Sequence, residues 1–84
     1  MDEKSAYLTS AQIRAARAWL NWTAGELASR AGLGITTIQR AEAEGGAIKM
    51  TRVNMEAVRR TFEAAGVRFT DDGGIAPTTP PAAE

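Results

Sequence analysis

Apolar residues recur at intervals of three and four along four stretches of the chain, which is the period of an amphipathic helix. In the first stretch Ile13, Ala16 and Leu20 share one face. Two shorter helical stretches follow, separated by a glycine-containing turn, and a longer one comes last. The pattern therefore predicts helices over residues 10–20, 23–31 and 35–43, and a fourth that starts between 51 and 54 and ends at 65.

Two of these helices begin with the same arrangement of polar side chains. Thr9 and Gln12 precede the first helical stripe, and Thr23 and Glu26 precede the second. A threonine three residues before Gln or Glu forms a capping box, in which each side chain pairs with the other residue's backbone amide. Gly32 then ends the second helix, because glycine adopts the left-handed conformation that follows many helices. The arrangement predicts a tight turn between the second and third helices.

After the last helix the pattern changes from a helical to an alternating one. Val67 to Thr70 alternates apolar and polar residues, which predicts a short strand, and Asp71 to Gly74 has the composition of a turn. The remaining chain contains the three prolines and is expected to be disordered. We therefore expect an all-α fold, a small helix-turn-helix bundle of about four helices with a short C-terminal β-strand. Its parts would be a flexible N-terminus (1–7), the domain (8–70) and a disordered tail (71–84).

Composition narrows the range of functions. The 84 residues allow one domain, and the absence of cysteine and histidine removes disulfides, thiol chemistry, the commonest general base and the commonest zinc ligands. We expect no enzyme, no metal and no cofactor. No apolar run reaches the ~20 residues of a membrane span, and the N-terminus lacks a signal peptide's apolar stretch, which favours the cytoplasm. The net charge is zero, yet residues 11–69 carry nine basic and five acidic residues.

The central segment from Thr23 to Ala43 has the order helix, tight turn, helix. Here the chain resembles the lambda-repressor/Cro-like family, also called XRE-type helix-turn-helix proteins, over about residues 8–69. The resemblance rests on Ile13, Arg17, Leu20, Thr23, Glu26, Leu27, Ala28, Ala31, Gly32, Leu33, Ile38 and Glu42. It implies a DNA-binding domain whose third helix enters the major groove. It also implies an ion pair between Arg17 and Glu42 that ties the first helix to the third.

In that geometry one face of the third helix points outward, toward the bases. Arg40 can bind guanine with two hydrogen bonds, Gln39 can pair with adenine, Thr36 can donate to a base, and Ile35 can contact a thymine methyl group. These four residues are the predicted base contacts. Contacts to phosphate are predicted for Arg14, Thr23, Thr37, Lys49 and Arg52.

Dimerisation is expected because the strand over residues 67–70 has no evident partner in its own chain. A second copy would pair with it in antiparallel fashion across a two-fold axis. In the alternative, Val67 and Phe69 fold back onto their own helices and leave a monomer. The predicted dimer interface consists of Trp19, Met55, Phe62, Val67, Arg68 and Phe69.

Together these features predict a sequence-specific regulator of transcription that binds double-stranded DNA as a homodimer on a palindromic operator. A repressor is favoured, because a chain this short has no room for a separate effector domain, and no small-molecule effector is evident. We expect the protein to act in the cytoplasm, at the nucleoid of a bacterial or phage-type system. The alternative is a protein-interaction module on the same fold, such as an antitoxin or a regulator's partner, which would use the acidic, proline-rich tail.

Overall fold

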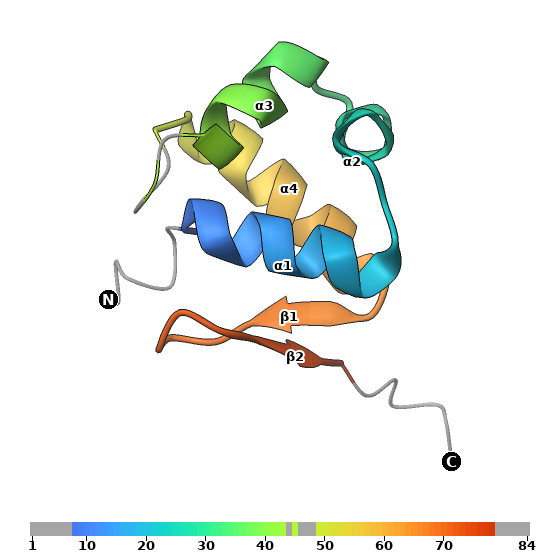
Figure 1. The fold of residues 1–84 in the computed structure, drawn as a ribbon, viewed down its shortest axis with the longest axis vertical. Coiled ribbons are helices and arrows are strands. Elements are labelled where there is room, and N and C mark those ends of the chain that lie inside the picture. The colour runs from blue at the N-terminus through green and yellow to red at the C-terminus, as the bar shows by residue number, and fades with distance from the viewer. Residues whose placement is uncertain (1–7, 44, 46–48, 79–84) are drawn as a thin grey trace.

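The computed structural model describes residues 8–43, 45 and 49–78, which form four helices and a two-stranded sheet (Figure 1). The expected fold class is thereby confirmed. The N-terminal segment 1–7 and the last six residues, for which flexibility and disorder are predicted above, lie outside the described residues. The elements are α1 (Ser10–Leu20), α2 (Ala24–Ala31), α3 (Ile35–Ala43), α4 (Arg52–Ala64), β1 (Val67–Phe69) and β2 (Ile75–Pro77).

Both predicted capping boxes are present. The Thr9 hydroxyl accepts from the Gln12 amide at 3.1 Å, and Gln12 Oε1 accepts from the Thr9 amide at 3.0 Å. At the start of α2 the Thr23 hydroxyl accepts from the Glu26 amide at 3.0 Å. Each box pairs amides that a helix leaves unpaired at its first turn. Helices α1 and α2 therefore begin at the residues that the local sequence specifies.

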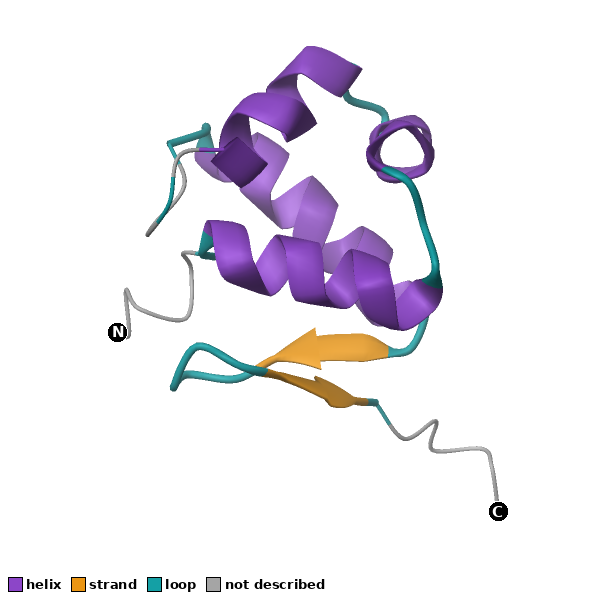
Figure 2. Cartoon of the chain, in the orientation of Figure 1, coloured by secondary structure: helices purple, strands orange, loops and turns teal. Residues whose placement is uncertain are grey.

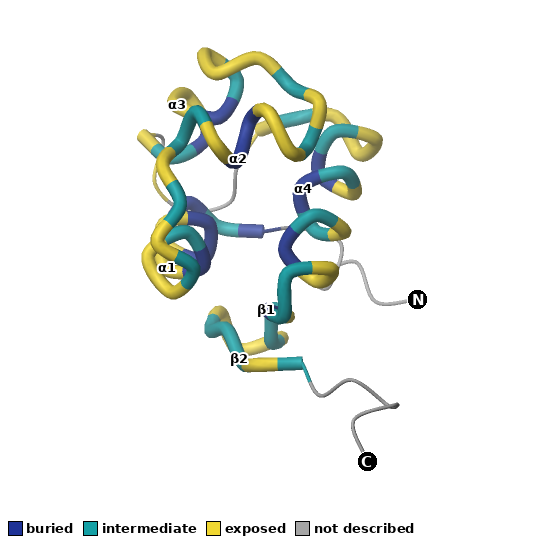
Figure 3. Tube along the Cα trace, turned by 90° about the vertical axis from the view of Figure 1, so that its right-hand side faces the viewer, coloured by how far each residue is buried: buried dark blue, intermediate teal, exposed yellow. Residues whose placement is uncertain are grey.

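The core lies between the helices, with the hairpin of β1 and β2 closing one side beneath α1 and α4 (Figure 2). Figure 3 shows the buried segments of α1, α2 and α4 facing one another. Phe62 is fully buried at its centre: Trp22 stacks on it at a centroid distance of 5.6 Å, and Phe69 meets it edge-on at 5.6 Å. The buried apolar residues are Leu8, Ile13, Ala16, Leu27, Ala28, Ile38, Ala41, Met55, Val58, Phe62 and Val67. Within the described part of the chain, no helix is both long and apolar enough to cross a membrane.

The C-terminal hairpin corrects the expectation of a single strand followed by a disordered tail from residue 71. β1 pairs with β2 in antiparallel register, with Val67 opposite Pro77. Hydrogen bonds from the Thr78 amide to the Gly66 carbonyl and from Thr70 to Gly74 flank the pair. Because hydrogen-bonded and non-hydrogen-bonded pairs alternate, Pro77 falls at a position where its missing N–H removes no bond of the pair. Proline is therefore compatible with this strand.

A buried glutamine joins the hairpin to α1. Gln12 is only 4% exposed, and its Nε2 donates to the carbonyls of Gly74 at 3.0 Å and Thr70 at 3.3 Å. Its Oε1 accepts from the Thr9 amide, so both ends of the side-chain amide are paired. An unpaired buried amide is costly, whereas a fully paired one fixes a single arrangement. Gln12 therefore fixes the position of the hairpin turn against the start of α1.

The strand-pairing interface predicted for a dimer is wrong in its main residues. Met55, Phe62 and Val67 are at most 2% exposed and belong to the protomer's own core. Val67 and Phe69 fold back onto their own chain, because β2 supplies the partner strand and the helices supply the apolar contacts. Full burial of Val67 also covers its backbone, which leaves no edge there for a second copy. Of the six predicted residues, Trp19 is 55% exposed and Arg68 is exposed, whereas Phe69 is half-buried.

Candidate nucleic-acid interface

The turn between α2 and α3 has the predicted geometry. Gly32 follows α2 with φ of 74°, in the left-handed region, and the Leu33 amide donates back to the Ala28 carbonyl at 2.9 Å. Gly34 stands directly before α3, and its carbonyl accepts from the Thr37 amide at 3.1 Å. Space around Gly32 is open, so glycine is favoured there by the backbone angle and not by a neighbouring atom. Two short helices are thus joined at a sharp, fixed angle.

Helix α3 buries one face and exposes the other. Ile38 and Ala41 are buried in the core, which fixes the rotation of the helix about its own axis. In Figure 3, α3 lies at the end of the molecule farthest from the hairpin. All four residues predicted to contact bases are exposed, and they come from its first six positions: Ile35, Thr36, Gln39 and Arg40.

The Ile35 side chain lies beside the first turn of α2. A methyl group built on Gly25 would lie 3.5 Å from Ile35 Cδ1, which is ordinary van der Waals contact. Ile35 is 46% exposed, so part of this apolar side chain still faces solvent. An isoleucine at this position has nothing polar to offer a partner, and its exposed part suits an apolar contact.

Polar side chains on one face of α1 hold the C-terminal end of α3. Ser10 and Arg14 stand four residues apart on this face. The Ser10 hydroxyl donates to the Ala41 carbonyl and accepts from the Gly45 amide, and Arg14 Nη1 donates to the Glu42 carbonyl. Carbonyls in the last turn of a helix lack partners within it, so these bonds satisfy groups that would otherwise be unpaired. One donor of Arg14, a predicted phosphate contact, is thus used inside the protomer.

The predicted ion pair between Arg17 and Glu42 is confirmed. Arg17 Nε and Nη2 lie 2.6 and 2.7 Å from the two carboxylate oxygens, and Nη1 donates to the Trp22 carbonyl at 2.9 Å. The side chains are 24% and 11% exposed, so the pair is mostly shielded from water. The hydrogen bond to Glu42 raises the pKa of Arg17 above its ordinary value, against the opposing effect of burial. The geometry is the two-pronged one that makes such pairs strong.

This pairing also determines the charge on the exposed face of α3. Glu42 is the only acidic residue within the helix, and its carboxylate is occupied by Arg17. Arg40 is therefore the charge that α3 presents to solvent. The exposed face combines one cation, two hydrogen-bonding side chains and an apolar one, which is a suitable set for the edges of base pairs.

The remaining predicted phosphate contacts lie on separate elements. Thr23 is exposed at the start of α2, Thr37 is half-buried in the first turn of α3, and Lys49 and Arg52 are exposed beside the start of α4. The Thr23 amide donates to Glu26 Oε1 at 3.4 Å, so a carboxylate already caps α2. A phosphate approaching this end of α2 would meet the charge of Glu26, which weakens the case for Thr23.

Sequence reasoning missed the structural role of Ser10 and the second role of Gln12, its bonds to the hairpin. Ser10 has the helical spacing of Arg14 and Arg17, so the period of the polar residues of α1 was the available signal. For Gln12 only the contact with Thr9 was visible, because its contacts with the hairpin join residues about sixty positions apart. No protein-family model and no curated protein matches this chain, so its function is argued from its residues and fold.

Proposed function

We propose that this protein binds double-stranded DNA in a sequence-specific manner, with α3 in the major groove, as a small transcriptional regulator of the lambda-repressor/Cro type. One observation carries the proposal: four exposed side chains gather on the outer face of α3, while its inner face is fixed by the core. The major groove is ~12 Å wide and admits one helix. A helix held in this way after a sharp turn can enter it without rearrangement.

The exposed side chains suggest which bases are contacted. Arg40 binds guanine O6 and N7 with its two-pronged guanidinium, and Gln39 pairs with adenine. Thr36 donates to a base or contacts a thymine methyl group, and Ile35 contacts a thymine methyl group only. Lys49, Arg52 and Thr37 contact phosphates on either side and set the position of the domain on the duplex, without contributing to the choice of sequence.

The bonds from α1 to α3 contribute to affinity by limiting motion. Ser10, Arg14 and Arg17 hold the last turn of α3, so little conformational freedom is lost when the helix enters the groove. Less ordering on binding leaves more of the interaction energy for affinity. The three residues act as positioning residues and do not themselves contact bases.

Two copies bound to a palindromic site would double the base contacts, with recognition helices about one turn of DNA apart, ~34 Å. We propose a dimer on this ground, acting as a repressor at the bacterial or phage-type nucleoid, because occupancy of the operator alone blocks a polymerase. The dimer surface does not include β1. Trp19, exposed in the last turn of α1, is its apolar candidate.

The test is selection of bound sequences from random double-stranded DNA, followed by titration of the selected site. We expect one enriched half-site and affinity that falls steeply with salt through counterion release. Arg40→Ala should weaken binding of the selected site by about 5- to 150-fold, as expected for one two-pronged base contact. Arg68→Ala removes an exposed arginine of β1 and serves as the matched control, with affinity close to that of the wild type.

Two results would overturn the proposal. Selection without an enriched sequence would favour the protein-interaction module instead. An enriched sequence that Arg40→Ala binds as tightly as the wild type would show that α3 does not lie in the groove.

A further inference from the structure

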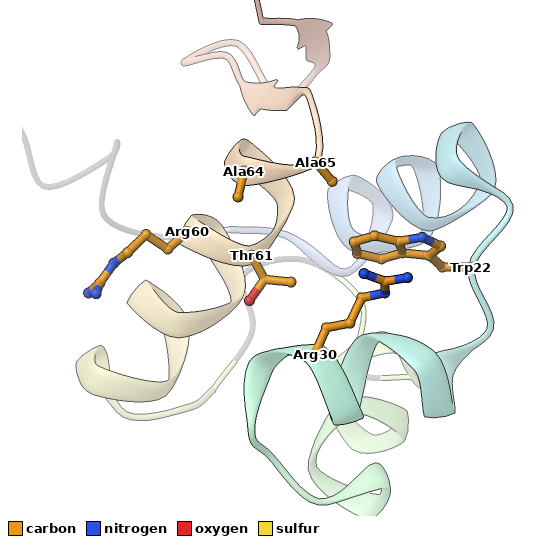
Figure 4. Close-up of a pocket in the computed structure, with 6 residues that line it drawn as sticks. All are labelled: Trp22, Arg30, Arg60, Thr61, Ala64 and Ala65. Atoms are coloured by element: carbon orange, nitrogen blue, oxygen red, sulfur yellow. The ribbon is translucent and has the colours of Figure 1, made fainter.

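A hollow of about 450 Å³ lies between α2 and the second half of α4. Beyond Arg60, the end of α4 presents only small side chains here, and these leave a space that Trp22 and Arg30 do not fill. Among the described residues none from α3 lines it, so it is separate from the surface proposed to bind DNA. The lining residues, shown in Figure 4, are Trp22, Arg30, Arg60, Thr61, Ala64 and Ala65.

Trp22 and Arg30 form one wall of the hollow, and the buried ring of Phe62 stacks against Trp22. Phe62 is buried in the core, Trp22 lies on it at 5.6 Å with 19° between the rings, and the Arg30 guanidinium lies over Trp22 at 4.5 Å. Stacking on Trp22 restricts the motion of the Arg30 side chain. A ligand that binds its N–H groups therefore costs less side-chain entropy than one that binds an unstacked surface arginine.

The charge of the hollow is positive. Arg30 brings its guanidinium to the hollow beside Trp22, whereas Arg60 lines it from α4 with a guanidinium that points away from Arg30 (Figure 4), and no acidic residue of the described chain is among the lining residues. The nearest acid, Glu26, lies 3.7 Å from Arg30 Nη2, which is beyond hydrogen-bond distance, and both side chains are about half exposed. Such an exposed pair is weak. An anion in the hollow would meet a guanidinium whose donors remain open.

We propose that this hollow binds a small organic anion, with a carboxylate or phosphate group held by Arg30 and a compact apolar body against Ala64 and Ala65. A volume of about 450 Å³ suits a molecule of metabolite size and not a helix or a strand. Arginine binds both anionic groups with paired hydrogen bonds. This site does not depend on DNA binding, and it gives the chain a ligand site that its sequence does not reveal.

The test is a nuclear magnetic resonance titration of the full chain with benzoate, phenyl phosphate and neutral benzamide at constant ionic strength. We expect saturable shifts of the Thr61, Ala64 and Ala65 amides and of the Trp22 indole N–H with at least one anion. The dissociation constant should be about 1–10 mM, as expected for a fragment at ordinary ligand efficiency. Benzamide, which matches benzoate in shape, should give no saturable shift.

Two variants locate the site. Arg30→Gln should weaken anion binding about tenfold or more by removing charge-assisted hydrogen bonds. Ala64→Leu should abolish it by filling the hollow without changing the charge, and Arg68→Gln should leave it unchanged. Equal binding of benzamide, wild-type affinity in both folded variants, or the absence of saturable shifts with both anions would each overturn the proposal.

Discussion

Replacing Arg17 with alanine tests how α3 is held against α1. Glu42 would keep a carboxylate that is 11% exposed and lose both hydrogen bonds, and the Trp22 carbonyl would lose its donor. Removing one partner of a buried pair costs about 3–5 kcal/mol, whereas exposed pairs contribute at most ~1 kcal/mol. Because Arg17 is 24% exposed, we expect a loss of about 2 kcal/mol in the free energy of unfolding, between these limits.

At about 4–8 °C per kcal/mol for a domain of this size, the melting temperature should fall by about 8–16 °C. Thermal melting followed by circular dichroism measures this change, with Arg68→Ala as an exposed arginine control that should melt close to the wild type. The double variant Arg17→Ala/Glu42→Ala should recover part of the loss, because no carboxylate is then left without a partner. A single variant that melts within 2 °C of the wild type would refute the reasoning, as would a double variant whose loss equals the sum of the single losses.

Three further changes test other parts of the structure. Gln12→Ala should cost about 1–3 kcal/mol in chemical denaturation and speed amide exchange in the hairpin, because the Gly74 and Thr70 carbonyls each lose one donor and the Thr9 amide loses its acceptor. Gln39→Ala, on the exposed face of α3, should cost almost nothing in the same experiment. Gly25→Ala should stabilise the domain by up to ~1 kcal/mol in chemical denaturation, since the added methyl group fits; destabilisation would show that it does not. The hydrogen bond from Thr70 lowers the pKa of Asp72, so its contribution is present above the ordinary aspartate range and is lost as pH falls through the lowered pKa. A carbon-detected titration should place this pKa below that of a peptide aspartate, and Thr70→Val should remove most of the difference.

The helices were predictable because their signals are local. A capping box spans four residues, and the apolar stripe of α1 repeats within a helical turn, so a short window contains the information. β2 lacks such a signal. Its three residues include a proline, and its place depends on pairing with β1 and on the distant Gln12 side chain. Contacts between such distant residues cannot be predicted from a short window of sequence.

One part of the candidate site was likewise predictable from the sequence, and other features were not. The exposed face of α3 was predictable, because Ile38 and Ala41 had to face inward and thereby placed Arg40 outside. The burial of Met55 was not, since an apolar residue of this kind fits a core and an interface equally well by composition. The hollow beside Trp22 required the relative positions of α2 and α4, which no sequence period supplies.

The attachment of α3 to the rest of the domain has an evolutionary consequence. Its inner side chains contact the core, and its last-turn carbonyls and the Glu42 side chain bind residues of α1. Thr36, Gln39 and Arg40 on its outer face take no part in these contacts. Substitutions at these three positions are therefore nearly neutral for stability, and the surface that we propose to contact DNA can change in descendants of this chain without first requiring a more stable fold.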